Sequence, residues 1–124
     1  MDQKVCIDTD VAIAILNNEE RAREAMKKIG DSEVYITTIT LFELMLRKTN
    51  LEAIELFQQK VDVMQFDEGA ARKASMIFKE LQQKGRTADI RDIFIAATCV
   101  TTGCALITFN TKHFEHIEEL QTIR

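Results

Sequence analysis

The sequence predicts an α/β protein with a central, mostly parallel β-sheet that is covered on both faces by helices. Two observations support this prediction. Short apolar segments alternate along the chain with longer segments of helical periodicity, an order that is typical of parallel sheets. The first and last apolar segments, VCI and ALITF, also lack a polar face, as expected of strands in the buried interior of such a sheet.

The elements can be assigned in order along the chain. We expect strands at residues 4–8, 34–37, 61–66 and 105–109. Helical patterns cover residues 11–16, 19–29, 40–47, 51–60, 68–84 and 88–100. Three of these helices are followed by a glycine, a residue that commonly ends helices, at Gly30, Gly85 and Gly103.

The composition is that of one folded domain, which we expect to span residues 1–124. Apolar residues make up 46% of the chain and charged residues 29%, which excludes the disordered class. No apolar run approaches the roughly 18 residues of a membrane span. The N-terminal segment MDQKVCIDTD lacks the apolar stretch of a secretion signal, and the cysteines lack metal-site or disulfide spacing. We therefore expect a cytoplasmic protein with reduced thiols.

The net charge of −4 argues weakly against a nucleic-acid partner, because proteins that bind nucleic acids usually present a basic surface. However, a group of carboxylates that binds a metal ion would supply part of this negative charge, and the ion would neutralise it. The overall charge therefore leaves a nucleic-acid function open.

Two polar side chains follow predicted strands at the same edge of the sheet. Asp8 ends the first strand in VCIDTD, and Asn110 follows the last strand in LITFNT. Because α/β proteins form their sites beyond the carboxyl ends of parallel strands, we expect both side chains in one crevice. A buried carboxylate at Asp8 also needs a hydrogen bond, a cation or a counter-charge.

Glu43 lies among apolar residues in TLFELML and has two interpretations. Thr40 and Glu43 match a capping box, in which the glutamate bonds back to the start of its own helix. Alternatively, the surrounding apolar residues place its carboxylate at the boundary of the core, where it can belong to a site. The sequence leaves both interpretations open.

Asp92, in TADIRDIFIAATC, is the carboxylate that helix-end effects explain least. We expect Thr87 to cap this helix and Asp89 to lie in its first turn, where a negative charge is favourable. Asp92 comes one turn later and shares a helix face with Ile95 and Cys99. A site carboxylate is the favoured interpretation, and a buried aspartate that pairs with an arginine or a backbone N–H is the alternative.

Asp8, Glu43 and Asp92 together offer three oxygen ligands against an apolar background, with Asn110 as a fourth polar group. Hard divalent ions such as Mg²⁺ and Mn²⁺ prefer oxygen ligands. Ions held in this way activate water and offset charge on a phosphate. These residues therefore predict metal-dependent phosphodiester chemistry that needs no serine, cysteine or histidine nucleophile.

Two other functions fit parts of the same pattern. Asp8 and Asp10 match the DxD pair of a haloacid-dehalogenase-type phosphatase, but no second aspartate pair of that class follows LITFN. A catalytically inactive binding scaffold is the second alternative. The presence of all three acidic residues argues against it.

Histidines and basic residues give weaker signals. His113 and His116 lack metal-site spacing and are predicted to be surface imidazoles. A further set of basic side chains could hold a phosphate backbone or form an ordinary solvated face, and the two readings are equally good. This set is Arg47, Lys48, Lys84, Arg86, Arg91 and Lys112.

Four segments, CIDTDVAI, TLFELMLR, DIFIAATC and LITFNTKHF, resemble in order the motif blocks of the PIN-domain ribonucleases. The greatest similarity is to the small VapC toxins of prokaryotic toxin–antitoxin modules, and it covers essentially the whole chain. This resemblance implies a three-layer α/β/α sandwich and an endoribonuclease site that depends on Mg²⁺ or Mn²⁺ and cleaves tRNA, rRNA or mRNA. It also implies a VapB-type antitoxin as partner and a homodimer.

The resemblance assigns roles to individual residues. Asp8, Glu43 and Asp92 match the acidic metal ligands of the family, and Asn110 matches a fourth catalytic position that is aspartate in many members. Since Asn110 carries no charge, a second tightly bound metal is in doubt. Two hydroxyl residues match those commonly found beside the site, Thr9 and Thr108.

Asp10 and Asp89 are acidic residues without a clear counterpart in the family pattern. Asp10 is interpreted as the cap of the helix at 11–16, with an additional supporting carboxylate of the site as the alternative. Asp89 precedes Asp92 by one turn and could line the same crevice.

Overall fold

A five-stranded parallel sheet forms the centre of the fold in the computed structural model, which describes residues 3–124. Residues 1 and 2 of the predicted domain lie outside this part of the chain. The strand order is β3-β2-β1-β4-β5, and every neighbouring pair is parallel. The strands are β1 (Lys4–Ile7), β2 (Glu33–Thr37), β3 (Asp62–Met64), β4 (Ala105–Ile107) and β5 (Thr122–Ile123).

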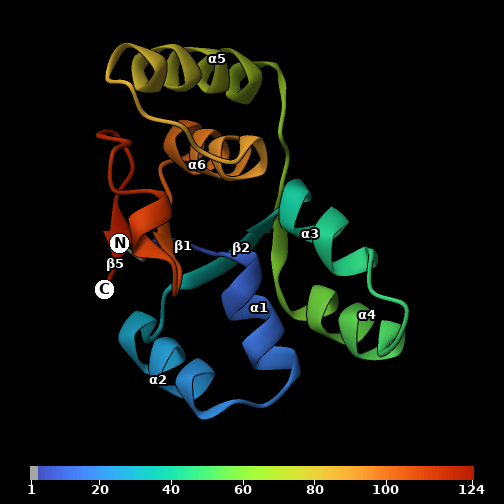
Figure 1. The fold of residues 1–124 in the computed structure, drawn as a ribbon. Coiled ribbons are helices and arrows are strands. Elements are labelled where there is room, and N and C mark those ends of the chain that lie inside the picture. Colours follow the sequence, from blue (N-terminus) through green and yellow to red (C-terminus); the bar gives the residue numbers. More distant parts are fainter. Residues whose placement is uncertain (1–2) are drawn as a thin grey trace.

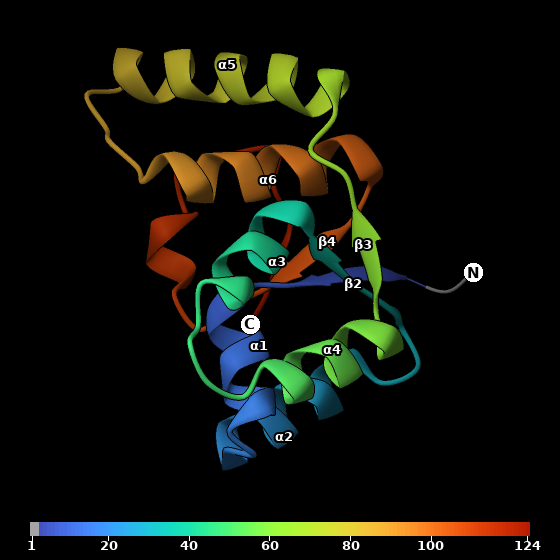
Figure 2. The same ribbon diagram turned by 90° about the vertical axis from the view of Figure 1, so that its right-hand side faces the viewer.

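Helices cover both faces of this sheet (Figures 1 and 2). The helices are α1 (Thr9–Leu16), α2 (Glu20–Ile29), α3 (Thr38–Met45), α4 (Leu51–Lys60), α5 (Glu68–Gln83) and α6 (Ile90–Thr102), with a 3₁₀ turn η1 (Thr111–His113). Helices α5 and α6 lie side by side on one face, while α1, α2 and α4 lie on the other. The predicted three-layer α/β/α sandwich is therefore confirmed.

The central strands β1 and β4 separate two hydrophobic clusters. Cys6 and Leu106 point into the cluster formed with α5 and α6, whereas Val5, Ile7 and Ile107 point into the cluster formed with α1 to α4. All five side chains are buried, because successive residues of a strand alternate between the two faces of the sheet. The prediction of two-sided burial for these strands is confirmed.

The predicted strands at 61–66 and 105–109 extend beyond the observed β3 and β4. At their ends, hydrogen bonds to side chains replace the backbone hydrogen bonds between strands. After β3, the backbone N–H of Phe66 donates to the hydroxyl of Thr38 and not to a neighbouring strand. After β4, the N–H of Phe109 donates to the carboxylate of Asp10. The short strand β5 was not predicted, because two residues give no recognisable alternation.

Four predicted helix starts, at residues 11, 19, 40 and 88, are wrong by one or two residues. Helix α3 begins earlier than expected, with the hydroxyl of Thr37 accepting from the N–H of Thr40 at 3.1 Å. The predicted capping box between Thr40 and Glu43 is therefore wrong. At α6 the N-cap is Asp89, whose carboxylate accepts from the N–H of Arg91 at 2.8 Å, so Thr87 is not the cap. As a consequence, Asp92 lies in the first turn of α6 and not one turn later.

Helix α1 begins at Thr9, and its N-cap is Asp8. The favoured interpretation of Asp10 as a helix cap is therefore wrong, since Asp10 lies inside the first turn. The three cysteines are buried and unpaired. Between residues 3 and 124, no helix combines the length and the apolar character needed to cross a bilayer.

Candidate active site

Asp8 lies at the carboxyl edge of the sheet, where β1 and β4 end together. Its N–H donates to the carbonyl of Ile107 at 2.9 Å, which continues the pairing of the two strands. One carboxylate oxygen accepts from the hydroxyl of Thr108 at 2.7 Å, and the other accepts from the N–H of Thr9 at 2.8 Å. The residue is only 6% exposed. Both oxygens are therefore held in place by neutral donors.

The surroundings of Asp8 disfavour its negative charge. The pKa of Asp8 is raised from 3.8 to about 6: burial is the largest cause, the nearby charges of Asp10 and Asp92 add to the rise, and the hydrogen bonds from Thr108 and Thr9 oppose it. Within residues 3–124, Asp8 forms no ion pair with a basic side chain. At neutral pH this carboxylate is ionised without a compensating cation.

Asp10 joins the start of α1 to the loop after β4. Its Oδ2 atom accepts from the N–H of Phe109 at 3.1 Å and from the side-chain amide of Asn110 at 3.0 Å. The N–H of Asn110 in turn donates to the hydroxyl of Thr108 at 3.0 Å. Burial raises the pKa of Asp10, and the hydrogen bonds from the backbone N–H groups of Phe109 and Val11 oppose the rise. Asp10 therefore fixes the loop that carries Thr108 and Asn110.

Glu43 reaches the same region from α3. Its Oε1 atom accepts from the hydroxyl of Thr9 at 2.9 Å, and that hydroxyl lies 3.0 Å from the hydroxyl of Thr40. The Nη1 atom of Arg91 lies 3.5 Å from Oε2 of Glu43. The glutamate side chain is 22% exposed, in agreement with the predicted position at the boundary of the core.

Asp92 faces the site from the first turn of α6. Its Oδ2 atom lies 3.3 Å from Nδ1 of His113, and the side chain is 21% exposed. Burial raises the pKa of Asp92, His113 opposes this shift, and the negative charges of Asp89 and Glu43 add to it. The predicted alternative of an arginine or backbone partner is wrong, because the partner of Asp92 is a histidine.

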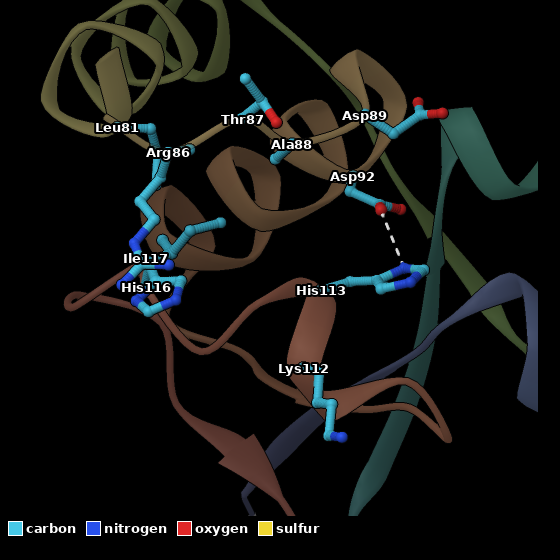
Figure 3. A pocket seen from close by; sticks show the side chains of 10 residues that line it. All are labelled: Leu81, Arg86, Thr87, Ala88, Asp89, Asp92, Lys112, His113, His116 and Ile117. Carbon is cyan, nitrogen blue, oxygen red and sulfur yellow. Dashed lines mark ion pairs between the residues drawn. The ribbon is translucent and has the colours of Figure 1, made fainter. Parts of the chain in front are cut away.

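A cleft of about 570 Å³ opens beside Asp92 (Figure 3). The connection between α5 and α6 forms one wall, and η1 with the turn that follows it forms the other. Asp89 also lines this cleft, so it shares a crevice with Asp92. The acidic pair lies at one end, and Arg86 and His116 lie at the other (Figure 3).

The three predicted metal ligands lie near enough for charges to interact, but they are not arranged as a metal site. Over the described range 3–124, no three His, Cys, Asp or Glu side chains are arranged to hold an ion as they stand. Glu43 is directed to Thr9 and Arg91, and Asp92 to His113. The charges nevertheless interact, since Asp92 raises the pKa of Asp8 and Glu43 raises that of Asp92. A set of mutually repelling carboxylate oxygens fits a divalent cation chemically.

Some contacts of the site were missed in the sequence. His113 was correctly predicted to be at the surface, with its side chain 58% exposed, but its contact with Asp92 was not predicted. The sequence offers Arg91 either as a phosphate contact or as part of a solvated face, and neither interpretation includes its pairing with Glu43. The sequence suggests only a capping box for Thr40, whose hydroxyl in fact lies 3.0 Å from that of Thr9. The only sequence signal for these contacts was the position of each residue beside a motif that carries an acidic residue.

Known proteins are similar to this chain in sequence and in fold. The PIN domain family matches residues 5–120. The tRNA(fMet)-specific endonuclease VapC of Salmonella typhimurium is 31% identical over 122 residues, which cover 92% of each chain. The protein of the same name from Shigella flexneri is 29% identical over 126 residues, which cover 96% of each chain. Among solved structures, DNA-bound VapBC from Salmonella typhimurium matches with a TM-score of 0.86 and 29% identity, covering 98% of this chain and 97% of that chain.

Proposed function

The chain belongs to the PIN domain family, and we propose that it is a metal-dependent endoribonuclease, the toxin of a VapBC-type toxin–antitoxin pair. The observation that carries this proposal is that Thr9 contacts both Asp8 and Glu43 near the carboxyl edge of the sheet, while the charge of Asp92 interacts with both of these carboxylates. The relatives named as tRNA(fMet)-specific endonucleases support RNA as the substrate. The family match gives no support to the phosphatase alternative.

Asp8, Glu43 and Asp92 would hold Mg²⁺ or Mn²⁺. Carboxylate oxygens are the preferred ligands of these ions, and the raised pKa of Asp8 reflects a charge that a cation would stabilise. When bound, such an ion lowers the pKa of a water molecule and offsets negative charge on the phosphate.

The protein's own residues prepare this site. Thr108 and the N–H of Thr9 hold the two oxygens of Asp8, and the hydroxyl of Thr9 orients Glu43. Asp10 fixes the loop after β4 through Phe109 and Asn110, so that the Asn110 amide stands next to the site. We assign to Asn110 the positioning of water or phosphate.

Arg91 and His113 are the cationic neighbours of Glu43 and Asp92. If those carboxylates turned to an ion, both side chains would become available to a phosphate. Arginine is well suited to this contact because its guanidinium matches phosphate oxygens in a fork geometry. We therefore assign to Arg91 a supporting contact with the substrate.

A VapB-type antitoxin and a second copy of the chain are the proposed protein partners. The VapBC complex of Salmonella typhimurium, which has the same fold, supports this assignment. Helices α3 and α4 also expose large apolar side chains, which a partner would cover. These residues are Phe42, Met45, Leu46, Leu51 and Leu56.

Cleavage of purified RNA tests the proposed function. The partner-free chain would be incubated with total tRNA and rRNA plus Mg²⁺ or Mn²⁺, beside the Asp92→Asn variant and an EDTA control. We expect metal-dependent cleavage by the wild type and none by the variant. Folded wild-type protein that neither cleaves RNA nor binds either ion in calorimetry would favour the inactive scaffold instead.

A further inference from the structure

The cleft beside Asp92 continues well beyond the acidic residues. Its volume of about 570 Å³ lies in the range of small-ligand sites, so it can hold part of a polynucleotide. Arg86 contributes from the connection between α5 and α6, while Lys112 and His116 contribute from η1 and the turn after it. Figure 3 shows Arg86 and His116 at the end of the cleft that is opposite to the Asp92–His113 pair.

Arg86 and Lys112 differ from two basic residues next to them in the sequence, Lys84 and Arg91, in having no acidic partner among the described residues. Lys84 pairs with Glu118 at 2.8 Å, and Arg91 pairs with Glu43 at 3.5 Å. In the described chain from residue 3 to 124, Arg86 has no ion pair and no side-chain hydrogen bond, and the same is true of Lys112. Two cations without an acidic partner that line the same cleft favour an anionic ligand there.

The cleft also has an apolar part. Leu81 and Ile117 line it, although both side chains are almost completely buried in the core. His116 presents a flat ring beside them and has one other polar contact, Nε2 to Glu115 at 3.4 Å. Cations for phosphates, together with an apolar surface and a ring for sugar or base, are the combination that binds single-stranded nucleic acid.

We propose that this cleft binds the RNA strand on one side of the scissile phosphate, with Arg86 and Lys112 contacting the phosphates of the neighbouring nucleotides. This inference rests on the ribonuclease function proposed above. The charges differ between the two ends of the cleft. Asp89 and Asp92 repel phosphates at one end, so a phosphate there needs a bound cation, whereas Arg86 attracts phosphates at the other end without one.

Binding to RNA without metal tests the cleft separately from catalysis. The double variant Arg86→Gln/Lys112→Gln would be compared with wild type and with Arg72→Gln/Lys79→Gln, a control that removes two exposed cations of α5 outside the cleft. The probe is a fluorescein-labelled single-stranded RNA oligonucleotide in EDTA, followed by anisotropy at several salt concentrations. We expect the cleft variant to bind roughly tenfold more weakly, with a salt slope smaller by about 1.4.

The outcomes separate the two proposals. An unchanged affinity and salt slope in the cleft variant would overturn the RNA-binding role, and so would an equal loss in the control pair. Cleavage with Mn²⁺ is then measured on the same proteins, where we expect a raised KM and a nearly unchanged kcat for the cleft variant. Failure of the wild type to cleave RNA would overturn the ribonuclease function, whatever the binding result.

Discussion

The two sides of the acidic site hold their carboxylates in different ways. On the β1–β4 side, Asp8 and Asp10 accept hydrogen bonds from hydroxyls, backbone N–H groups and the Asn110 amide, with no ion pair in the described residues. On the α3–α6 side, Glu43 and Asp92 face the basic side chains of Arg91 and His113. The first side is built from strand ends and the second from helix surfaces.

This difference indicates which part of the site is preorganised. The oxygens of Asp8 are fixed by neutral donors that can stay in place when a cation binds. Glu43 and Asp92 would have to exchange Arg91 and His113 for the ion. We therefore expect the β1–β4 side to determine where the ion binds, and the α3–α6 side to determine how tightly. The predictions below test this division.

The largest effect is expected on the rate of RNA cleavage when Asp8, on the β1–β4 side, is changed. Asp8→Asn removes the charge that the ion would neutralise but retains the shape of the side chain. We expect cleavage of tRNA in Mg²⁺ to fall by at least roughly 10²-fold. Single-turnover rates measure this loss. A variant that cleaves at the wild-type rate would show that Asp8 is a structural cap only.

The same substitution should stabilise the protein in EDTA. The folded-state pKa of Asp8, about 6, lies above its ordinary value of 3.8, so the folded state binds this proton more tightly than the unfolded state does. Protonated Asp8 therefore contributes roughly 3 kcal/mol to the free energy of unfolding. This contribution is fully present below about pH 4 and is lost as the pH rises through about 6. Urea unfolding at several pH values should show this fall in wild type and a weaker one in Asp8→Asn.

Substitution of Asp10 is expected to have a smaller effect on stability, through the loop after β4. Asp10→Ala leaves the N–H of Phe109 without its acceptor and releases the Asn110 amide, so we expect a loss of about 1–2 kcal/mol in unfolding free energy. Hydrogen exchange of the Phe109 amide should become faster. Asp10→Asn serves as the matched control, because its carbonyl oxygen can still accept one of these bonds.

The smallest effect is expected on the α3–α6 side, where an ion would replace Arg91 and His113 as the partner of the carboxylates. Arg91→Gln removes the cation that competes with the metal for Glu43, and a half-exposed ion pair is worth at most about 1 kcal/mol. The affinity for Mn²⁺ should therefore increase by no more than about fivefold. Calorimetric titration of both proteins measures this change. Weaker metal binding in the variant would contradict the proposed competition.

Much of the fold could be read from the sequence, because its central elements are encoded locally. Strands β1 and β4 are apolar on both faces, and this pattern alone places Asp8 at the carboxyl edge of a parallel sheet. Helix starts were harder to predict, since several threonines and aspartates near each start can serve as the cap. Thr37 caps α3 although Thr40 and Glu43 carry the better local pattern.

The contacts within the site were less predictable for a different reason. Asp10 binds Phe109 and Asn110, residues about one hundred positions away, so no local pattern reports these bonds. The partners of Glu43 and Asp92 likewise come from other elements. Sequence patterns identified which side chains could carry the chemistry, and the packing of α1, α3 and α6 decides what each of them touches.

Thermal unfolding of wild type and Asp8→Asn, with and without Mn²⁺ at pH 7.5, tests most directly whether these carboxylates form a metal site. In EDTA the variant should unfold at the higher temperature. With Mn²⁺ at about 100 times its Kd, wild type should gain about 2.7 kcal/mol, and the variant much less. If Mn²⁺ shifts both proteins equally, or shifts neither, then Asp8, Glu43 and Asp92 do not bind the ion together.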